Sequence, residues 1–454
     1  MPGPIPRPPR FLVGCIIASA VAIFAAGAGL IVLVSRVNDM SEAAKEEPSA
    51  ERAYRAAGLP WEAKDLRPGV IVSSVKNAAP LLRSAIGLFD SNQFNSAYIA
   101  MRKDMDAGSL ESVIDGLAPF QKAMDVAVRA SDRPDIDFGR DMDKGPAILF
   151  PEYAPVKGIA KALCLRAQLD VARHDTTAMA RDLGAAWKLG VLMGRDPILI
   201  GMLVQIAIQN ITLNAIQSCA YNLKKNRVGL EKLMSIIDKA QPPDYGFAMR
   251  GEAFMGIATI RNLKAFGGIK GLTAANDGSN IQTDLSHLSR TGMPNDTTTR
   301  AFAARHMQVW AEAKTIIDRD QKDAAKLGSD MDQLVMKVEQ KKTASNLLNM
   351  IMFPVFSQAG VAATSIQAEV IANKAMLTAL IAGKLPTSLN DIPGTWTDPY
   401  TKKPMLFTNY KDGFRVYSVG PNRKDDGGVF RAENKSGDSN AYDVGASCPP
   451  PPRK

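Results

Sequence analysis

The chain lacks the residue patterns that identify many enzyme families. It contains no G-x-S-x-G, no H-E-x-x-H and no G-x-x-x-x-G-K-[ST] segment, which are typical of serine hydrolases, zinc peptidases and phosphate-binding loops. Histidine is scarce: the chain contains only His174, His287 and His306. The sequence therefore predicts no catalytic centre, although a site assembled by folding would leave no such pattern.

Cysteine is almost as rare. Cys15, Cys164, Cys219 and Cys448 lie far apart, and none forms a C-x-x-C pair. This spacing excludes a disulfide framework or a zinc site of the usual kind and leaves open a single Cys164–Cys219 bond. Aromatic residues make up only 6% of the chain. Ala, Leu, Met and Lys are plentiful instead, which favours a mainly helical fold.

The positive charge of the chain is not concentrated in one segment. The formal net charge is +9, but the lysines occur in scattered pairs at 224–225, 341–342 and 402–403. A nucleic-acid-binding protein usually gathers basic residues into one patch, often interleaved with aromatic residues. We therefore expect a solvated basic surface and no nucleic-acid partner.

One long apolar run, Phe11 to Val34, contains no charged residue. As a helix it would be about 36 Å long, enough to cross a hydrocarbon core of about 30 Å. The run predicts a single transmembrane anchor in membrane lipid. Because Arg7 and Arg10 precede it, we expect a cytoplasmic N-terminus, an exported body and a location in the inner membrane. Cleavage near Ala25 is the alternative.

The chain beyond the anchor is predicted to be mainly α, with a small C-terminal α+β module that contains an antiparallel β-sheet. The expected domains are a leader (1–10), the anchor (11–34), a helical body (35–356), the module (357–447) and a Pro-rich tail (448–454). Apolar spacing or a composition rich in alanine predicts helices over 40–57, 79–89, 108–130, 155–172, 177–193, 197–221, 227–240, 302–316 and 359–383. The first of these is expected to break near Pro48, and Asn77 is expected to cap the second.

The module begins to differ in pattern after residue 383. Phe407, Phe414, Val416 and Val419 alternate with polar residues on either side of the turn at 410–413, which predicts a β-hairpin.

The module contains the segments 385–389 (LPTSL), 398–404 (DPYTKKP), 414–422 (FRVYSVGPN) and 425–428 (DDGG). In sequence, these four segments resemble the C-terminal half of the type II secretion major pseudopilin. They are still more similar to a module at the end of uncharacterised, membrane-anchored bacterial envelope proteins. The resemblance covers about 70 residues and the helix before them, and it implies a fold rather than a function. Arg10 precedes Phe11 and Cys15 replaces the glutamate of the pseudopilin helix, so a polymerising subunit is not expected.

The resemblance also implies a calcium site in the acidic loop of the module. Carried over by position, its ligands would be Asp425, Asp426, Asp438 and Asp443. Calcium is thus the one cofactor that the sequence suggests.

Two main functional hypotheses follow from the sequence. The first is a non-catalytic, single-pass envelope protein whose helical body and module form an interaction or assembly surface for an envelope protein partner. The second is an exported hydrolase or carbohydrate-binding enzyme with its site between body and module. Only the second requires a concave pocket that gathers carboxylates or a histidine of perturbed pKa. An accessory role in a type II secretion or pilus-like system is a third hypothesis.

Overall fold

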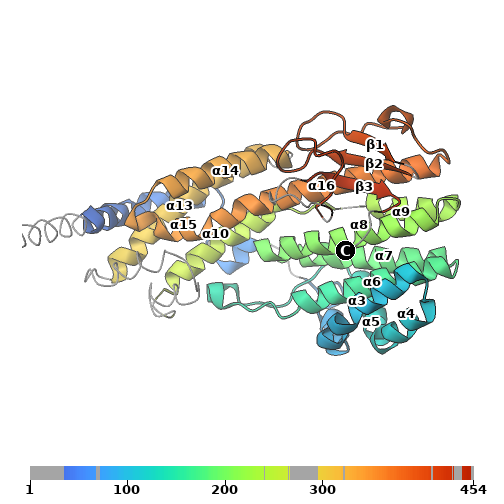
Figure 1. Ribbon diagram of the computed structural model, residues 1–454. Coiled ribbons are helices and arrows are strands. Elements are labelled where there is room, and N and C mark those ends of the chain that lie inside the picture. Colours follow the sequence, from blue (N-terminus) through green and yellow to red (C-terminus); the bar gives the residue numbers. More distant parts are fainter. Residues whose placement is uncertain are drawn as a thin grey trace, which may run out of the picture. The chain divides into compact units, whose positions relative to one another are not determined.

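The computed structural model describes residues 35–67, 72–239, 241–263, 265, 295–320, 323–410, 413–431, 433 and 442–450. These residues are mainly helical and end in a small antiparallel sheet (Figure 1). The predicted fold class is confirmed to that extent. The predicted leader and transmembrane anchor lie outside the described residues.

The chain forms two compact units. The first contains the residues up to Gly58, Gly256–Glu312 and Met336–Phe353, and the second contains Leu59–Met255, Ala313–Val335 and Pro354–Lys454. These boundaries differ from the predicted domains, because the C-terminal module shares the second unit with much of the helical body. The reason is that the long helix α16 (Pro354–Ile381) packs against α8 and α9 as well as against the sheet.

The helices of the second unit follow the chain in order. They are η1 (Ala63–Leu66), α2 (Ala79–Gly87), α3 (Ser91–Ala107), α4 (Leu110–Leu117), η2 (Ala118–Phe120), α5 (Gln121–Ser131), η3 (Met142–Ala147), α6 (Tyr153–Ala172), α7 (Thr176–Met193), α8 (Leu199–Asn222), α9 (Arg227–Asp238), α16 and η5 (Leu389–Asp391). The apolar spacing predicted α6 to α9 to within a few residues. It missed α3 altogether.

Side chains at the helix starts explain several of these boundaries. Asp175 accepts hydrogen bonds from the backbone N–H groups of Thr177 and Ala178, at 3.0 and 2.9 Å, and so caps α7. Asn77 was predicted to cap α2, but the N-cap residue is Ala78, which makes no side-chain cap. The Asn77 side chain lies one residue earlier and accepts a hydrogen bond from Ala79 N at 2.9 Å. Both side chains satisfy backbone donors that have no partner within the helix.

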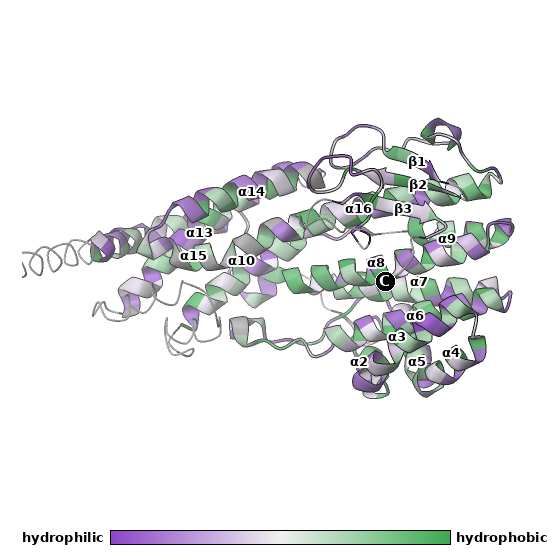
Figure 2. Cartoon of the chain, viewed as in Figure 1, coloured by the Kyte–Doolittle hydropathy of each residue, from purple (hydrophilic) through white to green (hydrophobic). Residues whose placement is uncertain are grey.

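Helices α6, α7 and α8 pack against one another and form the centre of the second unit. Apolar residues cover much of α8 (Figure 2). Among the described helices it alone has the length and composition of a membrane span. The mean hydropathy of its most apolar stretch of 18 residues is 1.6, yet 61% of that stretch is buried inside the protein. A mostly buried apolar helix inside a protein passes the same test of length and composition as a membrane span, so this finding is weak evidence for a span.

The sheet has three antiparallel strands in the order β1-β2-β3. They are β1 (Leu406–Tyr410), β2 (Gly413–Ser418) and β3 (Val444–Cys448), and β1 and β2 form the predicted hairpin. β3 was not predicted. Its last residue, Cys448, pairs with Phe414 and belongs to the sheet rather than to the predicted tail. Helix α16 packs on β2 and β3.

The first unit contains a helix over residues 35–56, η4 (Ala344–Asn346) and α15 (Leu347–Met352). Three further helices contribute residues to both units: α10 (Tyr245–Arg261), α13 (Asn295–Asp320) and α14 (Ala324–Gln340). The core of the first unit includes Met40, Ala43, Ile260, Phe302 and Leu348. α10 was not predicted, whereas α13 contains the predicted helix 302–316.

His306 lies in the core of this first unit and is fully buried. Its Nδ1 is 3.2 Å from Oδ1 of Asn349. A Cβ atom at Gly256 would lie 2.0 Å from the imidazole ring, so only glycine allows α10 to approach this close. The histidine therefore packs and hydrogen-bonds within the core.

One local prediction is wrong, and one possibility that the sequence left open does not occur. The helix over residues 35–56 continues through Pro48 without a break, because Ala44, Ala50 and Tyr54 are buried along it and their packing outweighs a proline penalty of roughly 3 kcal/mol. Cys164 and Cys219 are buried thiols and do not form a disulfide.

Candidate functional site

A cavity of about 700 Å³ lies between α8, α16 and the loops that flank β3, all within the second unit. We call it the module cavity. It is lined by Ile206, Asn210, Asn214, Gln217, Gln358, Val361, Ala362, Ser365, Glu369, Pro421, Phe430, Arg431, Tyr442, Asp443, Val444 and Gly445. This is the position that the second hypothesis assigned to a site, and the volume falls within the range of about 300–1,000 Å³ that is typical of ligand pockets.

The two helices present polar side chains to the cavity at helical spacing. Asn210, Asn214 and Gln217 follow one face of α8, and Ser365 and Glu369 are four residues apart on α16. Residues three or four apart lie on the same face of a helix. Polar side chains on otherwise apolar helices reduce stability unless they find hydrogen-bond partners, so their concentration around one cavity requires an explanation.

Among these polar side chains, Glu369 has the fewest interaction partners. It is partly exposed to the cavity, and among the described residues its carboxyl group has no hydrogen-bond or ion-pair partner. Burial raises the pKa of Glu369 to about 8, because a charged carboxylate loses its hydration there. At neutral pH the group is therefore mostly protonated and can donate a hydrogen bond into the cavity.

Other polar groups around Glu369 are partly satisfied within the protein. The Tyr400 hydroxyl lies 2.8 Å from Ser365 Oγ and donates to the Val361 carbonyl at 3.2 Å. Burial raises the pKa of Tyr400. The Gln217 side-chain oxygen accepts a hydrogen bond from Ser447 N at 3.3 Å.

Asn210 has an unsatisfied atom in the wall of the cavity. Its Oδ1 is buried and has no hydrogen-bond partner in the described part of the chain. A buried acceptor without a partner costs about 1–3 kcal/mol. The cavity thus offers an unused donor on α16 and an unused acceptor on α8, which is the arrangement that a ligand rich in hydroxyl groups would satisfy.

The structure brings three of the four predicted calcium ligands into one loop. The Asp443 carboxylate accepts hydrogen bonds from Asp426 N and from Gly428 N, at 3.1 and 2.7 Å. Burial, with the charges of Asp425 and Asp426 nearby, raises the pKa of Asp443 to about 6. The fourth residue, Asp438, lies outside the described residues.

The other acidic side chains of this loop also have partners within the protein. Asp425 accepts from Gly427 N at 2.9 Å, and Asp426 accepts from the side chain of Asn422 at 2.9 Å. Glu433 forms an ion pair with Arg415 at 2.7 Å. The described residues contain no group of three or more His, Cys, Asp or Glu side chains arranged to hold a metal ion. Calcium binding stays a prediction.

Glu369 and Asn210 were not among the residues selected from the sequence. The sequence does single out Glu369, because it is the only charged residue between Pro354 and Asn373. A lone charge in an apolar helix must face a partner, a cavity or solvent. For Asn210 no such signal exists, since asparagine and glutamine recur along α8.

Comparison with known proteins adds no assignment, since no family model, curated protein or solved structure matches the chain. The resemblance of the module to pseudopilins therefore stays a prediction from its sequence motifs.

Proposed function

We propose that the protein is a membrane-anchored receptor of the cell envelope that binds a neutral, hydroxyl-rich ligand such as a glycan segment in the module cavity. The anchor itself is proposed from the apolar run at residues 11–34. One observation carries the proposal: Glu369 and Asn210 place an unused donor and an unused acceptor in the wall of one polar cavity.

The chemistry of the other lining residues supports a neutral ligand. The side-chain amides of Asn214, Gln217 and Gln358 can each donate and accept hydrogen bonds. Phe430 and Tyr442 add aromatic surface, and Arg431 is the only lining residue that is always positively charged. Hydroxyl groups of a sugar both donate and accept, and the apolar faces of its rings pack on aromatic side chains.

A hydrolase remains the second candidate, because one feature of the cavity favours it. A carboxylic acid of raised pKa, such as Glu369, is the usual proton donor in glycoside hydrolysis. That reaction needs a second carboxylate. Asp443 also lines the cavity, but its oxygens accept hydrogen bonds from the backbone of the loop. We therefore favour binding without catalysis.

Binding can be tested by titrating the full-length protein, in mild detergent, with neutral oligosaccharides of two to six hexose units. We expect Asn210→Leu and Asn214→Leu each to raise Kd about three- to tenfold, since a hydrogen bond contributes roughly 0.5–1.5 kcal/mol. Asn222→Leu is the matched control, because Asn222 is exposed on the same helix and does not line the cavity.

Two results would contradict the proposal. Failure of every oligosaccharide to bind would remove the ligand class, and equal affinity of the Asn210 and Asn222 variants would place binding elsewhere. Release of shorter sugars by the wild-type protein, abolished in Glu369→Gln, would instead establish the hydrolase.

A further inference from the structure

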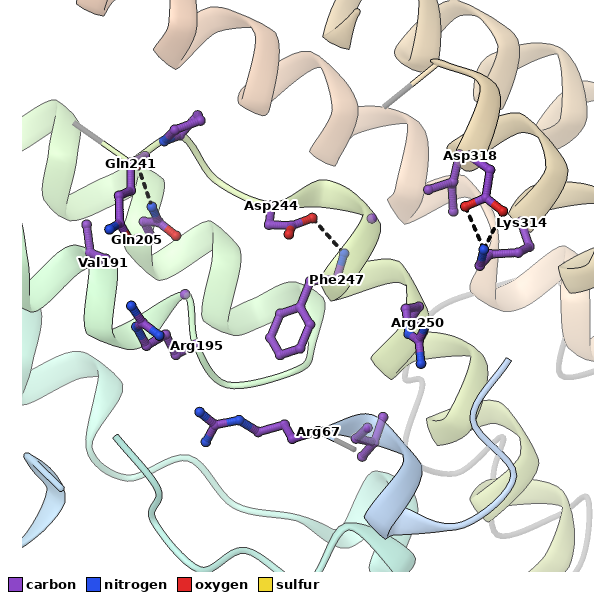
Figure 3. A pocket seen from close by; sticks show the side chains of 15 residues that line it. Arg67, Val191, Arg195, Gln205, Gln241, Asp244, Phe247, Arg250, Lys314 and Asp318 are labelled. Atoms are coloured by element: carbon purple, nitrogen blue, oxygen red, sulfur yellow. Dashed lines mark hydrogen bonds and ion pairs between the residues drawn. The ribbon is translucent and has the colours of Figure 1, made fainter. Parts of the chain in front are cut away.

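A second cavity in the second unit has a different chemistry. It has a volume of about 590 Å³, and Figure 3 shows the side chains around it. It is lined by Leu66, Arg67, Val191, Gly194, Arg195, Gln205, Gln241, Pro242, Asp244, Gly246, Phe247, Arg250, Lys314, Ile317 and Asp318. We call it the arginine cavity, because three arginines from separate segments of the chain surround the ring of Phe247.

Several of its charges are compensated within the protein. Lys314 pairs with Asp318 on α13. Arg67 donates to both carboxylate oxygens of Asp135, at 2.7 and 2.8 Å. Asp244 accepts from Phe247 N at 2.8 Å and so caps α10. These groups have structural partners, and they do not neutralise the remaining two arginines.

Arg195 and Arg250 have no close anionic partner. The nearest ion-pair contact of Arg195 is Asp135 at 3.9 Å, and Arg67 already occupies that carboxylate. In the described part of the protein the Nε of Arg195 is buried and lacks a hydrogen-bond partner. Arg250 donates only to a neutral group, the Asp65 carbonyl, at 3.3 Å.

The positive lining continues into an adjoining cavity, which shares Val191, Arg195 and Gln241 with the arginine cavity. The basic residues that line this neighbour are Arg133, Arg181, Lys188, Arg195 and Lys239, against one acidic residue, Asp132. Arg195 therefore lies at the junction of two cavities whose linings both carry an excess of positive charge. Such a concave region raises the local concentration of anions.

We propose that the arginine cavity binds a small organic ligand with phosphate or carboxylate groups, held by Arg195 and Arg250. The guanidinium group matches the geometry of both anions, because its N–H groups donate in pairs to two oxygens. An anion would supply the partner that both arginines lack, and the ring of Phe247 would contact the apolar part of the ligand. The site is separate from the module cavity and does not depend on the proposed function.

The test uses the full-length protein with inorganic pyrophosphate and citrate as separate probes, measured by calorimetric titration and thermal shift. We expect at least one probe to bind and to raise the Tm. We expect Arg195→Gln and Arg250→Gln each to raise its Kd at least tenfold, because hydrogen bonds to charged groups contribute roughly 1.5–3 kcal/mol. Comparison of the probes distinguishes a phosphate ligand from a carboxylate ligand.

Arg173→Gln is the matched control, since Arg173 is exposed at the end of α6 and lines neither cavity. The Kd of this control variant for the probe should stay within twofold of the wild-type value. An equal loss in all three variants would show general attraction to a basic protein and overturn the proposal, as would the failure of both probes to bind. Without ligand, Arg195→Gln should keep its Tm, because it removes no close ion pair. We expect Arg195→Gln and Arg250→Gln to bind oligosaccharides with the same affinity as the wild type, because neither residue lines the module cavity. The outcome of this test is therefore separate from that of the proposed function.

Discussion

Replacement of Glu369 by glutamine tests the electrostatics of the module cavity directly. The carboxyl group has a pKa of about 8 in the folded protein and an ordinary value of 4.5. Below pH 4.5 both the folded and the unfolded chain hold the proton, so Glu369 has little effect on stability. Between pH 4.5 and pH 8 the unfolded chain releases it while the folded chain keeps it, and the free energy of unfolding falls.

The size of the effect follows from these two values. Each pH unit in this interval costs about 1.4 kcal/mol, so Glu369 lowers the free energy of unfolding by roughly 3 kcal/mol at pH 7 and by roughly 5 kcal/mol above pH 8. Glutamine has nearly the same shape and cannot ionise. We therefore expect Glu369→Gln to match the wild type at pH 4.5 and to exceed its stability by these amounts at higher pH.

Urea denaturation of the full-length protein in detergent, followed by far-UV circular dichroism at pH 4.5, 7 and 8.5, measures this difference. Glu339→Gln is the control, because Glu339 is exposed on α14. It should show the same pH profile as the wild type. Parallel profiles for Glu369→Gln and the wild type would refute the reasoning, since they would mean that the carboxyl group ionises in the cavity without cost.

Two further predictions concern the core and the acidic loop. Asp182 is fully buried and pairs with Arg166, so Asp182→Ala should lower the free energy of unfolding by about 3–5 kcal/mol, whereas the double variant Asp182→Leu/Arg166→Met should lose much less. Equal losses in urea denaturation would contradict this. If calcium binds at Asp425, Asp426 and Asp443, calcium should raise the Tm of the transition that includes residues 357–447 relative to chelator in calorimetry. No shift, or the same shift in Asp425→Asn/Asp426→Asn, would exclude that site.

The local pattern of the sequence was sufficient for most of the secondary structure. The apolar spacing of α6 to α9 and the hairpin of β1 and β2 were predicted correctly, because each depends on neighbours within one turn or one strand. The failures have a common cause. The helix through Pro48 continues because distant segments bury its apolar side, and β3 was missed because short strands take their pairing from a remote partner.

The sequence by itself determined the helical character of the chain, the approximate bounds of α6 to α9 and the C-terminal hairpin, since these follow from short-range periodicity. Only the tertiary structure decided which polar groups share a cavity. Asn210 and Glu369 come from helices far apart in the chain, whereas Arg195 comes from the turn between α7 and α8 and Arg250 from α10. Their missing partners are a property of the folded environment, because desolvation and hydrogen bonding depend on what packs around a side chain.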